Sequence, residues 1–220
     1  YGNVVEVKDH QDYKEVITDD ATYEAKVVII ATGCEHRNLE VPGEAEYSGR
    51  GVSYCAVCDG AFFRNKKLIV VGGGDSAVEE AIYLTQFADE VKIVHRRDAL
   101  RAQKIIQDRA FANEKISFIW DSVVEEIKGD DQKVTGVQIK NVKTGETYEE
   151  AADGVFIYVG LLPLTQAFTS LGITDDAGWI VTDERMQTKI PGILACGDAR
   201  QKHLRQITTA VCDGGIAGQQ

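Results

Sequence analysis

The chain has few cysteines, a minority of basic residues and no long apolar run, and each shortage excludes a class of protein. Five cysteines among 220 residues are too few for a secreted scaffold built on disulfides, and the odd number leaves one thiol unpaired. No apolar run approaches the roughly 18 residues that a membrane-spanning helix needs. We therefore expect a soluble protein of a reducing, cytoplasmic compartment that has no membrane partner.

The balance of charge argues against a polyanionic partner. Lys and Arg number 24 against 35 Asp and Glu, which gives a net charge of −11. Such a charge repels the phosphates of nucleic acids unless basic residues cluster locally, so nucleic acid is not expected as a partner. Hydrophobic residues make up 44% of the chain, as in globular proteins, and the length suffices for one or two domains with a sizeable core.

Both ends of the sequence lack the usual signals. The chain opens with Tyr1 rather than Met and enters a strand-like segment at once, without the leader of a signal peptide. Its last segment has a helical pattern that reaches Gln220 without a Gly, Asn or Pro stop signal. We therefore expect an internal piece of a longer protein, with part of the function carried by segments outside it.

The middle of the chain predicts an α/β fold with a parallel sheet. Apolar runs at 68–71 and 91–94 predict buried strands, and periodic patterns at 75–88 and 99–113 predict a helix after each. This order gives parallel strands joined by right-handed crossovers. The apolar run 25–30 predicts a further strand that is buried on both faces.

Two changes of composition predict domain boundaries. Residues 34–51 are rich in Gly and Glu with little periodicity, and Gly160 and Pro163 mark a second break. Residues 116–160 predict an antiparallel meander that returns to the sheet at Val155. The other expected elements are strands at 4–8, 13–18, 179–181 and 193–196 and a helix at 207–220.

A glycine-rich loop follows the strand 68–71. Its sequence matches the dinucleotide fingerprint G-x-G-x-x-G/A and opens a helix, which is the context that the fingerprint requires. Gly72 permits the tight turn, Gly74 lets the backbone approach a pyrophosphate, and Ala77 lets the helix pack closely. A merely flexible turn is the weaker alternative. The candidate cofactor residues of the loop are Gly72, Gly73, Gly74, Asp75, Ser76 and Ala77.

The end of the second strand indicates which dinucleotide binds. A site for NAD places Asp or Glu here, about 20 residues after the loop, to bond the ribose 2′-hydroxyl. This chain has His95, Arg96 and Arg97 instead, with Arg101 one turn further. Because guanidinium groups bind phosphate in bidentate fashion, NADP(H) is favoured over NAD. His95 carries less weight, since a histidine at a strand end is often a surface residue.

The two cysteines of a C-x-x-C sequence, Cys55 and Cys58, predict a redox pair. Two intervening residues allow a small disulfide ring, and such surroundings commonly lower the pKa of one thiol. The carboxyl group of Asp59 is placed to give a proton to a leaving thiolate. A zinc site is disfavoured because the other cysteines are scattered singly, and we expect them to be small buried hydrophobes. They are Cys34, Cys196 and Cys212.

Three segments in this order, 49–60, 71–81 and 95–102, resemble those of bacterial low-molecular-weight thioredoxin reductases, and the resemblance covers essentially the whole chain. It implies NADPH as electron donor, FAD as relay, thioredoxin as acceptor and a homodimer in the full-length form. By analogy Cys58 faces the flavin, Cys55 attacks thioredoxin and Asp59 protonates the leaving sulfur. The adjacent Phe62 and Phe63 are either thioredoxin contacts or core residues.

The resemblance also implies a fold and a flavin site. A Rossmann-like NADPH-binding domain, residues 36–160, is inserted into an FAD-binding domain made of 1–35 and 161–220, as in flavoproteins with two dinucleotide-binding domains. The family's first glycine fingerprint, which binds the ADP half of FAD, and the C-terminal end are absent from this sequence. The candidate flavin residues are Thr32, Gly33, Gly197, Asp198, Arg205, Gln206 and Ile207. Three cysteines stand where the family has small residues.

Two alternative functions stay open at this point. The flavoprotein subunit of alkyl hydroperoxide reductase shares the reductase core but carries extra N-terminal domains, so upstream sequence would distinguish it. A non-catalytic NADP(H)-binding redox sensor would bind nucleotide without passing electrons to thioredoxin. The Ala56-Val57 pair between the two cysteines favours the thioredoxin reductase.

Overall fold

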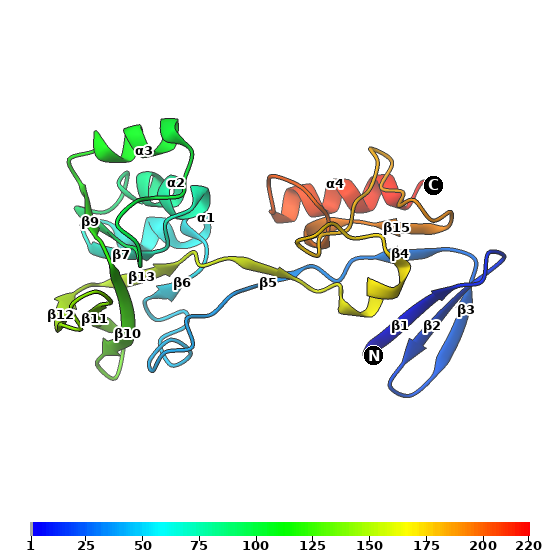
Figure 1. The fold of residues 1–220 in the computed structure, drawn as a ribbon, viewed down its shortest axis with the longest axis horizontal. Coiled ribbons are helices and arrows are strands. Elements are labelled where there is room, and N and C mark those ends of the chain that lie inside the picture. The colour runs from blue at the N-terminus through cyan, green and yellow to red at the C-terminus, as the bar shows by residue number, and fades with distance from the viewer. Residues whose placement is uncertain (1) are drawn as a thin grey trace. The chain divides into compact units, whose positions relative to one another are not determined.

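The computed structural model describes residues 2–220, so the opening Tyr1 lies outside the described residues. The chain forms two compact units, whose elements are labelled in Figure 1. Unit 1 contains the residues up to Glu35 and Leu161–Gln220, and unit 2 is the continuous stretch His36–Gly160. The nucleotide that each unit binds stays a prediction. Within residues 2–220, no helix is both long and apolar enough to cross a membrane.

Unit 2 is built on a five-stranded parallel sheet with the strand order β6-β13-β7-β8-β9. The strands are β6 (Val52–Ser53), β7 (Lys67–Val71), β8 (Glu90–Val94), β9 (Ile116–Ile119) and β13 (Gly154–Ile157). Helix α2 (Asp75–Leu84) follows β7, and helix α3 (Lys104–Phe111) follows β8. This arrangement confirms the expected α/β fold with parallel strands.

Both helices are shorter than the sequence pattern predicts. Helix α2 ends at Leu84 because the next three amides, those of residues 85–87, donate to carbonyls three residues back, so the chain leaves the helix through 3₁₀-type turns. Helix α3 begins only at Lys104, because the Arg101 amide donates to the carbonyl of Gly73 at 2.7 Å. Residues 95–103 therefore run as a loop beside the glycine-rich turn.

The meander is one strand shorter than expected. Strands β10 (Ser122–Gly129), β11 (Val134–Asn141) and β12 (Thr147–Ala151) form an antiparallel sheet, and β13 returns to the parallel sheet as predicted. The segment 116–120 was expected in the meander, but β9 pairs parallel to β8. Asp121, in the left-handed region with φ of 50°, then turns the chain into β10.

The parallel sheet of unit 2 buries apolar side chains on both faces. Leu68 and Val70 of β7 face α2 together with Phe156, while Ile69 and Val71 face the meander. This alternation is why the run 68–71 is apolar throughout. Fully burying a side chain such as Phe156 contributes about 1.5–3 kcal/mol, so the sheet is the rigid centre of the unit.

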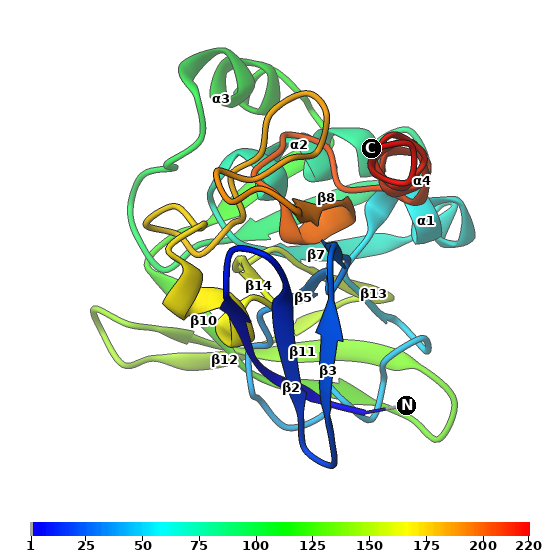
Figure 2. The same ribbon diagram turned by 90° about the vertical axis from the view of Figure 1, so that its right-hand side faces the viewer.

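Unit 1 contains small sheets and one long helix, α4 (Ile207–Ala217). Strands β1 (Val4–Asp9), β2 (Lys14–Thr18) and β3 (Thr22–Ala25) are antiparallel and lie side by side in Figure 2. Strand β4 (Val28–Ile30) pairs parallel with β15 (Ile193–Ala195). The other elements here are β5 (Cys34–His36), β14 (Leu161–Pro163) and the 3₁₀ turns η2 (Gln166–Leu171) and η3 (Gly197–Ala199). Unit 2 also contains α1 (Ala56–Asp59) and the 3₁₀ turn η1 (Gly60–Phe63).

Three expectations for unit 1 are wrong. The run 25–30 is divided between β3 and β4, and Val27 and Ile29 are 55% and 45% exposed, because among residues 2–220 the core packs against the face of β4 that carries Val28 and Ile30. The strand expected at 179–181 is absent, since Ile180 makes only isolated bridges. Of the lone cysteines, only Cys196 is buried; Cys34 is half-buried, and Cys212, on α4, is exposed.

Candidate active site

The predicted redox pair is a disulfide at the start of α1. Cys55 and Cys58 are bonded, with their Cα atoms 5.3 Å apart. Cys55 caps the helix: its Sγ accepts a hydrogen bond from the Cys58 amide at 3.2 Å. Among residues 2–220, no group of three or more His, Cys, Asp and Glu side chains could hold a metal ion. The two sulfurs form a disulfide, as expected for a redox pair, and Cys58 is the more exposed of the two.

The Asp59 carboxylate beside the disulfide is held by a buried hydroxyl. Ser53, at the end of β6, donates a hydrogen bond to Asp59 Oδ2 at 2.6 Å and accepts one from the Cys55 amide at 3.1 Å. Sequence reasoning missed Ser53, whose only signal is a small polar residue at the end of a buried strand. One side chain thus fixes both the proposed proton donor and the backbone of the first cysteine.

A tyrosine holds α1 from the other side. The Tyr158 hydroxyl accepts a hydrogen bond from the Ala56 amide at 2.7 Å, although the two residues are 102 positions apart in the chain. Burial, and to a smaller degree the nearby Glu80 carboxylate, raise the pKa of Tyr158, so the phenol stays neutral. The backbone carbonyl oxygen of Tyr158 lies close to Gly72: a Cβ atom on Gly72 would be 2.5 Å from it. Tyr158, which the sequence also did not indicate, therefore contacts both the dithiol helix and the glycine-rich loop.

The glycine-rich loop has the expected place between β7 and α2. Gly72 has a φ of +148°, which favours glycine, and any side chain there would collide with Tyr158 and Ala77. A Cβ on Gly74, by contrast, would meet nothing within 4 Å, so the backbone at Gly74 is open to a ligand. The loop therefore fits a phosphate group that approaches the first turn of α2.

His95 is buried rather than on the surface, and its contact with a cofactor stays a prediction. His95 is 5% exposed, because its ring packs against the backbone of Gly73. A Cβ atom on Gly73 would be only 2.4 Å from the nearest ring atoms. Burial lowers the pKa of His95, as do the charges of Arg101, Arg97 and Arg96, so the imidazole is neutral at pH 7. Its Nε2 is buried without a hydrogen-bond partner among the described residues. Such an atom is suited to a polar group of a ligand.

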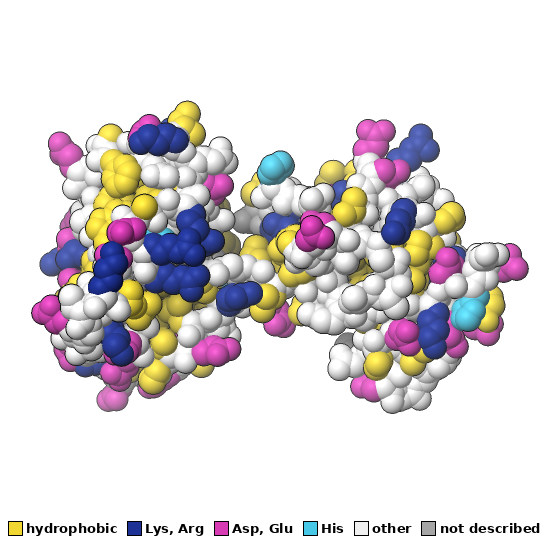
Figure 3. Space-filling view, in the orientation of Figure 1, with side chains coloured by type: hydrophobic (Ala, Val, Ile, Leu, Met, Phe, Trp, Pro, Cys, Tyr) yellow, Lys and Arg dark blue, Asp and Glu magenta, His cyan; other side chains and the backbone are white. Residues whose placement is uncertain are grey.

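A cavity of about 320 Å³ joins the loop to the basic segment. Gly72, Gly73, His95, Arg96 and Arg101 line it, so the structure brings these predicted residues together; Arg97 is not in its lining. Arg37, from the segment after β5, also lines the cavity and was not foreseen. Figure 3 shows basic side chains gathered on one face of this unit, despite the negative charge of the chain. The cavity is therefore suited to a phosphorylated ligand.

Asp75 has a different environment from the rest of the loop. Its Oδ1 accepts the Gln103 amide at 2.7 Å, and its Oδ2 accepts the side-chain amide of Gln103 at 3.3 Å. The carboxylate thus ties the basic segment to the start of α2. Direct contact of Asp75, Ser76 or Ala77 with a cofactor stays a prediction.

In unit 1, the predicted flavin residues follow two neighbouring strands. Because β4 and β15 are parallel, Thr32 and Gly33 leave the sheet at the same edge as Gly197 and Asp198. Both glycines have a φ of +73° and leave room where a side chain would stand. Asp198 Oδ1 is buried without a hydrogen-bond partner in residues 2–220, so it fits the hydroxyl of a bound ligand.

The last predicted segment lies at the start of α4. Arg205 stacks on Trp179, with its guanidinium carbon 3.7 Å from the ring centre, and its Nε donates to the Asp198 carbonyl at 3.3 Å. Gln206 caps α4 in a reciprocal arrangement with Thr209. Ile207 is 83% exposed. The Arg205 side chain is therefore held by contacts within unit 1. Gln206 marks the start of α4, and Ile207 offers an exposed apolar side chain beside it.

Comparisons with known proteins identify the family of the chain. The family model described as pyridine nucleotide-disulphide oxidoreductase matches residues 1–214. A thioredoxin reductase of Listeria monocytogenes is 64% identical over 219 residues, covering 100% of this chain and 69% of the relative; that of Bacillus subtilis is 57% identical with the same coverage. The chain belongs to the thioredoxin reductase family. This result confirms the resemblance inferred from the sequence.

Solved structures of thioredoxin reductases also match. The crystal structure from Streptococcus pyogenes is 67% identical with a TM-score of 0.92, and the match covers 100% of this chain and 72% of that chain. The enzyme from Giardia duodenalis is 38% identical with a TM-score of 0.93 and the same coverage. Membership of this family implies flavin and pyridine nucleotide in general, and it does not favour the hydroperoxide reductase subunit or the redox sensor.

For this thioredoxin reductase homologue we predict a specific effect of Ser53→Ala. The variant loses the hydroxyl that orients Asp59, so thioredoxin reduction should slow by about 3- to 10-fold, corresponding to one net hydrogen bond. Steady-state turnover with saturating NADPH measures the effect. Ser53→Thr, which keeps a hydroxyl, is the matched control. Equal turnover of Ser53→Ala and the wild type would show that Asp59 needs no such support.

Proposed function

We propose that this chain carries the dithiol and nucleotide machinery of an NADPH-dependent thioredoxin-disulfide reductase. The observation that carries the proposal is the placement of a disulfide and a phosphate-binding loop on one unit, joined through Tyr158. FAD, when bound, supplies a two-electron relay between the nicotinamide and the disulfide. Support comes from the thioredoxin reductases that match the whole chain at 57–64% identity.

The basic cavity of unit 2 is the proposed NADPH site. Arg96 and Arg101, which line the cavity, hold the 2′-phosphate, with Arg97 adding positive charge from outside the lining, while the amides of residues 73–77 at the start of α2 face the pyrophosphate. No carboxylate stands directly after β8 to bond a free 2′-hydroxyl, and the nearest one, of Asp98, is paired with Lys143 at 3.2 Å. These features favour NADPH over NADH.

The dithiol chemistry uses three side chains of this unit. Two electrons break the Cys55–Cys58 bond, and Asp59 gives a proton to the sulfur that leaves. The thiolate of one cysteine then attacks the thioredoxin disulfide, and the other cysteine resolves the mixed disulfide to release reduced thioredoxin. By family analogy Cys55 is the attacking residue. Val57 and Phe62, 55% and 81% exposed, are the proposed thioredoxin contacts, whereas Phe63 packs in the core.

Unit 1 is the proposed flavin-binding part. Gly33, Gly197 and Asp198 Oδ1, which has no hydrogen-bond partner in residues 2–220, fit a polyhydroxyl chain, and the start of α4 at Gln206 and Ile207 fits the edge of the flavin ring. Because the dithiol and the nicotinamide site lie on unit 2, we propose that rotation at the two connections between the units lets each reach the flavin in turn. A homodimer and a cytoplasmic location remain part of this proposal.

A direct assay tests the function. The full-length protein with FAD should reduce thioredoxin with NADPH, and with NADH at least about 10-fold less efficiently, since the 2′-phosphate contacts are charge-assisted. Reduction of a peroxiredoxin but not of thioredoxin would favour the hydroperoxide reductase subunit. Nucleotide binding without any electron transfer would favour the sensor.

A further inference from the structure

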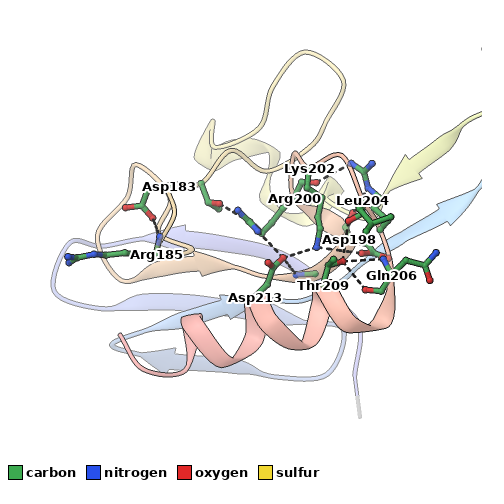
Figure 4. Close-up of polar contacts among 12 residues, drawn as sticks. Asp183, Arg185, Asp198, Arg200, Lys202, Leu204, Gln206, Thr209 and Asp213 are labelled. Carbon is green, nitrogen blue, oxygen red and sulfur yellow. Dashed lines mark hydrogen bonds and ion pairs between the residues drawn. The ribbon is translucent and has the colours of Figure 1, made fainter. Parts of the chain in front are cut away.

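A buried carboxylate on α4 joins three positions of the loop after β15. Asp213 Oδ2 accepts a hydrogen bond from the Gly197 amide at 3.1 Å and from Lys202 Nζ at 2.9 Å, and it forms an ion pair with Arg200 at 2.8 Å (Figure 4). The side chains of all three charged residues are only 11% exposed. Burial pushes the pKa of Asp213 up, but the hydrogen bonds from Lys202 and Arg200 outweigh it and hold the pKa below its usual value. Asp213 is therefore ionised at neutral pH.

These contacts surround Asp198, the proposed flavin ligand. Its backbone is held on one side by Asp213 through Gly197 and on the other by Arg205, which donates to the Asp198 carbonyl. Lys202, bonded to Asp213, also lies 4.0 Å from Asp198 Oδ1. That oxygen is buried but has no hydrogen-bond partner among the described residues. The cluster thus fixes the Asp198 backbone and leaves Asp198 Oδ1 with an ion-pair partner but without a hydrogen bond, so the oxygen can still accept one from a ligand.

We propose that Asp213 is the positioning residue of the flavin site. Asp213 does not contact the cofactor. It accepts hydrogen bonds from the Gly197 amide and the Lys202 ammonium group, and these bonds hold the loop so that Asp198 Oδ1 can accept a hydrogen bond from a ribityl hydroxyl. Neutral residues could fill the same space. A single carboxylate that pairs with a backbone amide and with two buried cations, however, allows only one arrangement of the loop. The proposal rests on the proposed function, because it takes the ligand to be FAD.

The test compares two carboxylate-to-amide variants of the full-length protein. Asp213→Asn removes the charge that holds Lys202 and Arg200, and FAD affinity should fall about 10- to 100-fold, the range for charge-assisted hydrogen bonds. Asp183→Asn is the matched control: Asp183 accepts the amides of Arg185 and Gln187 in an exposed turn of the same unit. This control should bind FAD within about twofold of the wild type. Titration of the FAD-free proteins with FAD, followed by flavin fluorescence, gives both values.

Two further variants separate positioning from stability. Asp213→Glu keeps the charge and should recover part of the affinity, and Lys202→Met removes the link to Asp198 without touching the bond from Gly197 to Asp213. If Asp213→Asn does not fold, a loss of FAD affinity in Lys202→Met, with a changed absorption spectrum of the bound flavin, still supports the proposal. Unchanged FAD affinity in both would overturn it. A wild type that binds FAD but does not reduce thioredoxin would instead refute the proposed function alone.

Discussion

Serine in place of Cys58 should reduce NADPH-dependent thioredoxin reduction by about 10³-fold or more, since a covalent exchange step cannot proceed without its second sulfur. The other three cysteines form no disulfide among residues 2–220, so Cys55 and Cys58 are the pair expected to carry the exchange. The same loss is expected for Cys55→Ser. Turnover of full-length variants with thioredoxin as the acceptor measures both effects.

The half-reaction that precedes the dithiol step provides an internal control. Neither substitution touches the basic cavity, which lies at the carboxyl ends of β7 and β8, so NADPH should still bind and still bleach the flavin under anaerobic conditions. Loss of both half-reactions would mean that the variant is misfolded rather than chemically blocked. Thioredoxin reduction that persists in either serine variant would exclude the Cys55–Cys58 pair as the electron exit. A further readout is a stable mixed disulfide with thioredoxin, which only the variant that retains the attacking cysteine should form.

The sequence predicts those parts of the fold that depend on local patterns. The apolar run 68–71, the glycine-rich loop and the helix that follows are encoded within about 20 neighbouring residues, and the structure has all three in this order. Strand pairing is not local: nothing within 116–120 distinguishes a fifth parallel strand from the first strand of a meander. Likewise, the run 25–30 has the composition of a fully buried strand, but among residues 2–220 the core packs against only the face of β4 that carries Val28 and Ile30.

The supporting residues of the site depend on contacts between distant parts of the chain. His95 is buried because Gly73, more than 20 residues earlier, leaves room for its ring. Tyr158 is 102 residues from its partner Ala56, and Asp213 is 16 residues from Gly197, so no motif contains either pair. Motifs therefore identify groups that touch ligands, whereas the residues that position those groups emerge only from the folded structure.

Removal of the guanidinium groups of Arg96 and Arg101 should shift the cofactor preference from NADPH towards NADH. In Arg96→Ala/Arg101→Ala, the KM for NADPH should rise about 10²- to 10⁴-fold, because each of the two charge-assisted bonds to phosphate contributes roughly 1.5–3 kcal/mol. The KM for NADH, which has no 2′-phosphate, should change little. Both side chains line the cavity beside Gly72 and Gly73, and Arg101 keeps its backbone bond to Gly73 when its side chain is shortened, so the loop should stay in place.

The control for this variant changes charge without changing the cavity. Arg109 lies exposed on α3, outside the cavity lining, and Arg109→Ala should leave both KM values within about twofold, as expected for a screened surface charge. The wild-type KM for NADPH should also rise with salt, and this dependence should weaken in the double variant. Equal increases of the KM values for NADPH and NADH would mean that Arg96 and Arg101 stabilise the loop rather than bind the 2′-phosphate. The preference for NADPH would then have to come from Arg97 or Arg37, the remaining guanidinium groups of this region.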